Sequence, residues 1–199
     1  MVFMRATIAQ SAELKRGDLR KNRAVISYAQ HVHNLYTLRM YTRTAPNPAF
    51  RQLFQDDPAL SEALEVMRTA FAGMEGRIDP PSSLKSMNLE SVNRAAGEAE
   101  VWAAGDPVVG TVTLTPKGSV LYVGKLAVLD PRQGLGRALM ALAEERAVAL
   151  GFKWLELQSR VELEEIHAVF KRLGFREVMR TTHEGYVRPT SVLFRKAVG

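Results

Sequence analysis

The sequence predicts an α/β or α+β domain in which helices cover a mixed β-sheet. Segments with alternating apolar and polar residues are interspersed with segments whose apolar residues recur at helical spacing. Short turns that contain glycine or proline separate these segments. The resulting order, β-α-α-β-β-β-α-β-α-β-β, supplies helices that need a sheet against which to bury their apolar sides.

The first part of this order contains four strands and two helices. Residues 35–42 (LYTLRMYT) alternate in character and are rich in tyrosine and threonine, which indicates a strand. Helices are expected at 58–73 and at about 88–97, with the turn-rich loop GRIDPPSS (76–83) between them. The three strands that follow are expected at 100–104, 108–115 and 119–129.

Helices and strands alternate in the remainder of the chain. Residues 135–150 carry a strong apolar stripe, and Gly151 follows in the position of a helix-ending glycine. A strand at 154–159 precedes a helix at 164–173, which Gly174 ends. The last two strands are expected at 175–179 and 191–196.

Composition excludes several classes of site. A chain of 199 residues with 46% apolar and 24% charged residues can form a self-sufficient core. The absence of cysteine excludes disulfides, thiolate metal sites and an acyl group held on cysteine. Four histidines do not suggest a metal cluster, and no metal is expected. No apolar run approaches the roughly 18–20 residues of a membrane span, so we expect a cytoplasmic protein without a membrane partner.

The positive charge is concentrated near the N-terminus. The net charge is +6, and residues 1–33 hold six basic and two acidic residues, a net +4. We expect these residues to form a basic extension, loose or with one short helix at about 15–30, separate from a domain at 34–199. An excess of basic residues favours polyanionic partners, so a nucleic-acid-binding or other polyanion-binding module remains an alternative. No nucleic-acid-binding motif is present, however.

Residues 126–140 (LAVLDPRQGLGRALM) carry the most informative pattern. An expected strand enters a glycine-bearing turn, and the turn opens a helix. Unpaired backbone N–H groups and the positive end of the helix dipole make such a turn an anion site, with Arg132 and Arg137 at its rim. The dinucleotide fingerprint fails because Leu139 replaces its third glycine, and the P-loop fails because Leu126 follows Gly124-Lys125.

The segment resembles the acyl-CoA-binding motif of the GNAT superfamily of N-acetyltransferases, Arg/Gln-x-x-Gly-x-Gly/Ala. Gly134-Leu135-Gly136 occupies the glycine positions, and FKRLGF (170–175) resembles the Tyr-x-x-x-Gly-Phe signature of the last helix. The order of elements also matches over roughly 34–199. The stretches GRIDPPSS, LYVGKLAV, RVELEEIHAVFKRLGF and HEGYVRPTS are together similar to a bacterial subgroup of that superfamily.

The resemblance implies a mostly antiparallel sheet, acetyl-CoA as cosubstrate, and direct attack by a primary amine in a ternary complex. The acceptor is expected to be a small-molecule or protein amine, and a homodimer is compatible with the resemblance. A CoA-binding relative without transfer activity is the remaining alternative. The implied cofactor contacts are Leu126, Ala127, Val128, Arg132, Gln133, Gly134, Leu135, Gly136, Arg137, Ala138 and Phe170.

Three positions depart from the family pattern. Pro131 stands in the position usually held by arginine or glutamine, although the amides of residues 132–138 are expected to remain free for a ligand. Phe170 replaces a tyrosine that can protonate the CoA thiolate, and Leu163 replaces an asparagine. The usual general acid is therefore missing.

Catalytic candidates come from the centre of the expected sheet and the nearby helix. Tyr122 lies four residues before Leu126 and is expected to share its face of the strand. His167 lies three residues before Phe170 and shares its face of the helix. Tyr122 and His167 are the predicted catalytic residues. Further base candidates are Glu156, Glu162 and Glu164, and further residues beside the acceptor are Met74, Arg77, Asp79, His183 and Tyr186.

Overall fold

A computed structural model describes residues 49–199, and it contains the predicted order of strands and helices. The predicted extension at 1–33, the helix at 15–30, the strand at 35–42 and the boundary near residue 34 lie outside the described residues. The elements, which include two short 3₁₀ helices, are β1 (Phe50–Leu53), α3 (Ala59–Ala72), η2 (Ser83–Ser86), α4 (Leu89–Glu98), β2 (Glu100–Ala104), β3 (Gly110–Lys117), β4 (Val120–Val128), η3 (Pro131–Gln133), α5 (Leu135–Ala149), β5 (Trp154–Arg160), α6 (Glu164–Arg172), β6 (Arg176–Thr181) and β7 (Ser191–Ala197).

Most boundaries fall within two residues of the expected ones, and the principal difference is β1. The strand that opens the described order is Phe50–Leu53, which the sequence pattern did not indicate. It pairs antiparallel with β2, so that Leu53 lies opposite Val101 at the edge of the sheet. Four residues are too few for alternation to separate a strand from a loop.

The strands form one seven-stranded sheet in the order β1-β2-β3-β4-β5-β7-β6. Every neighbouring pair is antiparallel except β4 and β5, which are parallel. The crossover between these two strands runs through α5, as a parallel connection requires. The mostly antiparallel mixed sheet is thereby confirmed.

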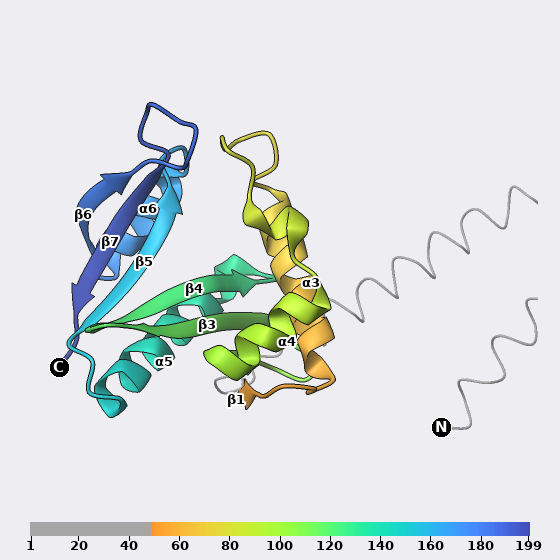
Figure 1. The fold of residues 1–199 in the computed structure, drawn as a ribbon. Coiled ribbons are helices and arrows are strands. Elements are labelled where there is room, and N and C mark those ends of the chain that lie inside the picture. The colour runs from red at the N-terminus through yellow and green to blue at the C-terminus, as the bar shows by residue number, and fades with distance from the viewer. Residues whose placement is uncertain (1–48) are drawn as a thin grey trace, which may run out of the picture. The chain divides into compact units, whose positions relative to one another are not determined.

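Helices cover both faces of this sheet (Figure 1). On one face, α3 and α4 bury residues such as Leu60, Met67 and Val92 against β1, β2 and β4. On the other face, α5 packs against β3, β4 and β5, and α6 adds Phe170 to the same cluster. We call these the α3 face and the α5 face. Each helix sequence carries the single apolar stripe that such a two-layer packing needs.

A β-bulge in β4 changes which face its side chains reach. Thr113 pairs with Gly124, but Thr111 pairs with Ala127, so β4 contains one residue more than β3 over this stretch. Lys125 has a left-handed φ of 51°, as a bulge residue often does. Tyr122 consequently lies on the α3 face, while Leu126 packs on the α5 face. The expectation that these two side chains share a face is wrong, because alternation stops at the bulge.

Helix α5 lies close to β3 at a glycine. A Cβ built on Gly110 would come 2.8 Å from Leu135 Cδ2 and 3.3 Å from Leu139 Cδ1. Both leucines belong to the core, and Leu135 is the first residue of α5. Gly110 therefore sets how closely the start of α5 approaches the sheet.

We predict that Gly110→Val lowers the melting temperature, because overpacking of a core contact costs about 1–3 kcal/mol. Gly73→Val is the matched control, since Gly73 has a φ of −66° and a Cβ there would meet nothing within 4 Å. Calorimetric or fluorescence melting of both variants is the measurement. Equal melting temperatures for the two variants would show that the Gly110 contact relaxes without cost.

Candidate functional site

Strands β4 and β5 separate in the middle of the sheet. They pair at only three positions, which join Val120 to Trp154, Leu121 to Leu155 and Tyr122 to Glu156. Beyond Tyr122, the described part of β4 keeps β3 as its neighbour, and β5 keeps β7. Figure 1 shows the two halves of the sheet diverging from this point. One edge of residues 123–128 thus has no sheet partner, and its backbone groups can pair with an extended ligand.

The turn after β4 is held by an aspartate. Asp130 accepts a hydrogen bond from the Arg132 amide at 3.0 Å and one from Gln133 Nε2 at 3.1 Å. These bonds lower the pKa of Asp130, the Arg132 amide contributing most, and keep its carboxylate charged. Gly134 then takes a left-handed φ of 76°, and α5 begins at the next residue.

The start of α5 presents three free amides. Ala138 N donates to Gly134 O at 3.1 Å, so the amides of Leu135, Gly136 and Arg137 precede the first bond of the helix. The expectation that all amides from 132 to 138 stay free is therefore wrong at both ends. Arg132 binds Asp130 with its amide, and Ala138 binds within the helix.

The space in front of these amides is open. A Cβ on Gly134 or on Gly136 would meet no protein atom within 4 Å. Arg132 is 92% exposed, and Arg137 is also exposed on the same turn. Unpaired N–H groups, a helix dipole and two cations together fit a pyrophosphate group. Leu135 itself is buried, so it offers its amide rather than its side chain.

On the α5 face, α6 contributes an aromatic cluster near the separation. Phe170 lies 5.7 Å from the ring of Phe194 and 6.1 Å from that of Phe175. The ring of His167 lies 5.1 Å from Phe194, and His167 Nε2 donates to the carbonyl of Arg160 at 2.8 Å. Because Nε2 is engaged, Nδ1 is the ring atom of His167 left for another partner.

Tyr122 lies on the α3 face, in a hollow lined by α3, α4, β3 and β4. Burial raises the pKa of Tyr122, and the carboxylate of Glu156 on the neighbouring strand raises it further. Lys117 Nζ sits 3.8 Å from the centre of its ring. Tyr122 therefore remains protonated at neutral pH, and the structure does not bring it together with His167, which is on the opposite face.

Two loops meet at the open end of the separation. Asp79, in the loop after α3, accepts from Tyr186 Oη at 2.7 Å and from Arg188 Nη2 at 2.8 Å, both in the loop after β6. Arg77 forms a short ion pair with Glu165 of α6. In Figure 1 these loops are the yellow and blue ones that approach each other. The hydrogen bond from Tyr186 contributes most to lowering the pKa of Asp79, so this carboxylate is charged at neutral pH.

Arg160, Glu162 and His183 lie beside these loops. Arg160 ends β5, and its Nη1 lies 2.9 and 3.0 Å from the two ring nitrogens of His183. Glu162 Oε1 accepts from the Asp79 amide at 3.3 Å, while Glu162 Oε2 is buried without a hydrogen-bond partner. Arg160 and Arg188 were not among the predicted site residues, because an arginine at a strand end or in a loop has no distinguishing sequence context.

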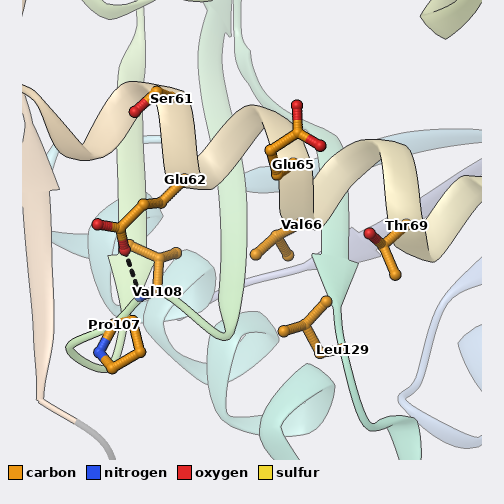
Figure 2. Close-up of a pocket in the computed structure, with 8 residues that line it drawn as sticks. All are labelled: Ser61, Glu62, Glu65, Val66, Thr69, Pro107, Val108 and Leu129. Atoms are coloured by element: carbon orange, nitrogen blue, oxygen red, sulfur yellow. Dashed lines mark hydrogen bonds between the residues drawn. The ribbon is translucent and has the colours of Figure 1, made fainter. Parts of the chain in front are cut away.

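A second hollow lies on the α3 face beside the end of β4 (Figure 2). Its floor is apolar, from Val66, Val108 and Leu129, and its walls include Glu62 and Glu65. Glu62 accepts a hydrogen bond from the Val108 amide at 2.9 Å, which ties α3 to the turn after β2. This hollow contains none of the predicted site residues.

Within residues 49–199, no group of three or more metal-ligating side chains is present. No helix in the same range combines the length and apolar character needed to cross a bilayer.

A family model described as "Acetyltransferase (GNAT) family" matches residues 62–175, more than half of the chain. The chain belongs to the GNAT acetyltransferase family. It is therefore an N-acetyltransferase, and its family transfers acyl groups from acyl-CoA to amines. The turn at 130–138, His167, Phe170 and Phe175 lie inside the matched region, and Phe194 of the aromatic cluster lies beyond it.

Solved structures show the same GNAT fold. An acetyltransferase from Streptococcus agalactiae is 16% identical, with a TM-score of 0.60, 77% of this chain and 100% of that chain being covered. An aminoglycoside 6'-acetyltransferase type Ii is 17% identical with a TM-score of 0.61. The alignment covers 75% of this chain and 96% of that chain. The ribosomal-protein-S18-alanine N-acetyltransferase from Escherichia coli is 16% identical with a TM-score of 0.55, covering 75% and 94%. No curated protein sequence matches the chain.

We predict that Asp79→Ala in this GNAT enzyme increases amide hydrogen exchange in both loops, at about 76–83 and 183–189, because Asp79 is the acceptor that links them. The link is complete at neutral pH and is lost only as the pH falls through the lowered pKa of Asp79. Glu90→Ala is the control, because it removes an ion pair with Arg94 on α4 that touches neither loop. Faster exchange in only one loop would contradict the linkage.

Proposed function

We propose that this GNAT enzyme transfers an acetyl group from acetyl-CoA to a primary amine by direct attack in a ternary complex. The observation that carries the proposal is the separation of β4 from β5, which ends at the open amides of Leu135, Gly136 and Arg137. An extended arm can pair with the β4 edge while its pyrophosphate binds these amides. The absence of cysteine favours direct attack over an enzyme-bound acyl group.

The cofactor would be held along the α5 face. We assign backbone contacts to the β4 segment, where the Ala127 side chain is buried under α3 and only its main chain can reach the separation. Phe170 would border the arm near its thioester. The proposed contacts are Leu126, Ala127, Val128, Arg132, Gln133, Gly134, Leu135, Gly136, Arg137, Ala138 and Phe170.

Acyl-CoA, when bound, supplies an activated thioester; the protein must hold the amine and accept its proton. Glu162 suits this role best among the three predicted carboxylates. Glu156 is 13% exposed and is already paired with Arg195 at 2.6 Å, and Glu164 is exposed on the first turn of α6. Of these three carboxylates in the described structure, only Glu162 has a buried oxygen without a hydrogen-bond partner. An amine can donate a hydrogen bond to that oxygen.

The remaining roles follow from the two faces. As the N–C bond forms and the C–S bond breaks, Glu162 would take the amine proton, directly or through water. An unpaired N–H of the β4 edge would donate to the developing oxyanion. Thiolate departure is tolerable because a thiol pKa is about 8.5, and we retain Tyr122 and His167 as candidates to supply its proton.

We predict that Gly136→Val weakens acetyl-CoA binding at least tenfold while the protein stays folded. The added branches would occupy the space in front of the helix amides, where a Cβ at this position meets no protein atom within 4 Å. Gly136→Ala is the matched control and should bind nearly as well, because its single methyl is smaller. Calorimetric titration with acetyl-CoA measures both. An unchanged acetyl-CoA affinity in the valine variant would show that the turn is not part of the cofactor site.

We predict that Glu162→Gln lowers kcat by about 10²–10⁴-fold, since an amide cannot accept the amine proton as a carboxylate does. Acetyl-CoA affinity should not change, because Glu162 lies with the loops at the acceptor end. Glu145→Gln removes an exposed carboxylate from the outer side of α5 and serves as the control. Steady-state CoA release gives kcat, and a fall of less than threefold for Glu162→Gln would exclude it as the base.

The alternative, a CoA-binding protein without transfer, predicts normal acetyl-CoA titration but no CoA release with any amine. The same two measurements therefore separate transfer from binding alone.

A further inference from the structure

The charges at the open end of the separation are not fully paired within the protein. Arg77 pairs with Glu165, and Arg188 pairs with Asp79. Two groups keep unused bonding capacity after these pairs are removed. Among the described residues, Arg160 has no carboxylate oxygen within 4.0 Å of its guanidinium, and one oxygen of Glu162 has no hydrogen-bond donor. The Oε1 atom of Glu162 is shared between the Asp79 amide and, at 3.5 Å, Arg188 Nη1.

Arg160 is partly buried, which makes its missing partner significant. Burial is the largest cause that lowers its pKa, opposed by the more distant carboxylates of Glu162 and Asp79. Its hydrogen-bond partner through the side chain is the ring of His183, at Nη1. A guanidinium carries five N–H donors, so donors remain for an acceptor oxygen. A buried cation without a counter-ion is costly, and it is expected where a ligand supplies the anion.

His183 supports this arrangement without adding charge. Burial, and after it the charge of Arg160, lowers the pKa of His183, so its ring is neutral at neutral pH. Thr190, which is buried, holds the ring through its hydroxyl oxygen 2.5 Å from Nδ1. A neutral ring can accept a hydrogen bond from Arg160 and orient the guanidinium while leaving its positive charge uncompensated.

Arg160 lies beside the part of the separation where transfer would occur. Tyr122 pairs with Glu156, so Arg160 is four residues along β5 from that point, just as Leu126 is along β4. Four residues of regular strand span about 13 Å, and the bulge at Lys125 shortens this advance on β4, so both residues lie beyond the last pair of the two strands. Glu156 pairs with Arg195, and Leu157 packs on the α5 face, so alternation places Arg160 on the face opposite α5. It therefore faces the side away from the proposed cofactor contacts.

We propose that the acceptor is a small molecule in which the amine lies next to a carboxylate, as in an α-amino acid, with its carboxylate on Arg160 and its amine on Glu162 Oε2. This proposal rests on the transferase function proposed above. The guanidinium without a direct ion pair and the carboxylate with one free oxygen are two residues apart in sequence and opposite in charge, which matches a small zwitterion. A single arginine flanked by a neutral histidine and by carboxylates favours a monoanion over a phosphate dianion. A lysine side chain of a protein has no carboxylate beside its amine.

The test compares the α-amino acids other than cysteine and proline with their α-amino amides, which keep the primary amine and lose the negative charge of the α-carboxylate. Transfer from acetyl-CoA is followed by thiol detection of released CoA, which the cysteine-free chain does not disturb. Binding of the same panel to protein saturated with CoA is followed separately by thermal shift and calorimetry. The variants are Arg160→Gln and Arg160→Lys, with Arg94→Gln as control for the loss of one exposed guanidinium.

We expect at least one amino acid to be preferred over its amide by tenfold or more in kcat/KM and in Kd. Arg160→Gln should raise the KM and Kd for that acid by about 10- to 100-fold, leave those for the amide unchanged, and keep the acetyl-CoA affinity. The KM and Kd of Arg160→Lys should lie between those of the original chain and those of Arg160→Gln. Lysine keeps the positive charge, but it cannot form the two parallel hydrogen bonds of a guanidinium. Arg94→Gln should behave as the original chain.

Equal use of acids and amides, transfer only to amines without a carboxylate, or an equal effect of Arg160→Gln on both series would overturn the proposal. In those outcomes the transferase function stands, since amines are still acetylated. Absence of CoA release with every amine would instead count against the transferase function. Selective binding of an amino acid that Arg160→Gln abolishes would then still support the acceptor site, and its absence would overturn it.

Discussion

The parallel pairing of β4 with β5 is the constraint on which the rest of the site depends. It extends over three residues and then stops, and one unpaired strand edge faces the separation. The α5 crossover that a parallel pair requires also delivers a helix N-terminus to the end of β4. One topological feature thus supplies both an unpaired backbone edge and free helix amides, which are the two features that the proposed cofactor contacts use.

The bulge in β4 divides the site between the two faces of the sheet. Before the bulge, Tyr122 faces α3; after it, Leu126 faces α5. The residues near the proposed cofactor are consequently on one side, and those near the acceptor are on the other. An amine and a thioester can then approach from opposite faces and meet where the strands part, which is the arrangement that direct transfer needs.

Much of the fold could be predicted because its elements are long and strongly patterned. The stripe of α5 and the alternation of β5 fixed their bounds to within about one residue. The bulge at Lys125 could not be predicted, because a single inserted residue leaves no trace in local composition. The glycines at 134 and 136 indicated the proposed anion site, because a left-handed turn at Gly134 and an open approach at Gly136 suit glycine. The roles proposed for Arg160 and Glu162 depend on their contacts with His183 and Asp79, respectively. These partners are far away in the sequence, so no local pattern could indicate the contacts.

The replacement of the family's tyrosine by Phe170 is understandable in this arrangement. Phe170, which is partly buried, packs with Phe175 and Phe194 in an aromatic cluster on the α5 face. On the other face, Tyr122 is held protonated by burial and by Glu156, and it remains a proposed proton donor. A proton from Tyr122 would not come from the helix that borders the proposed cofactor site. The loss of one hydroxyl on α6 thus leaves the chemistry of the family possible in this chain.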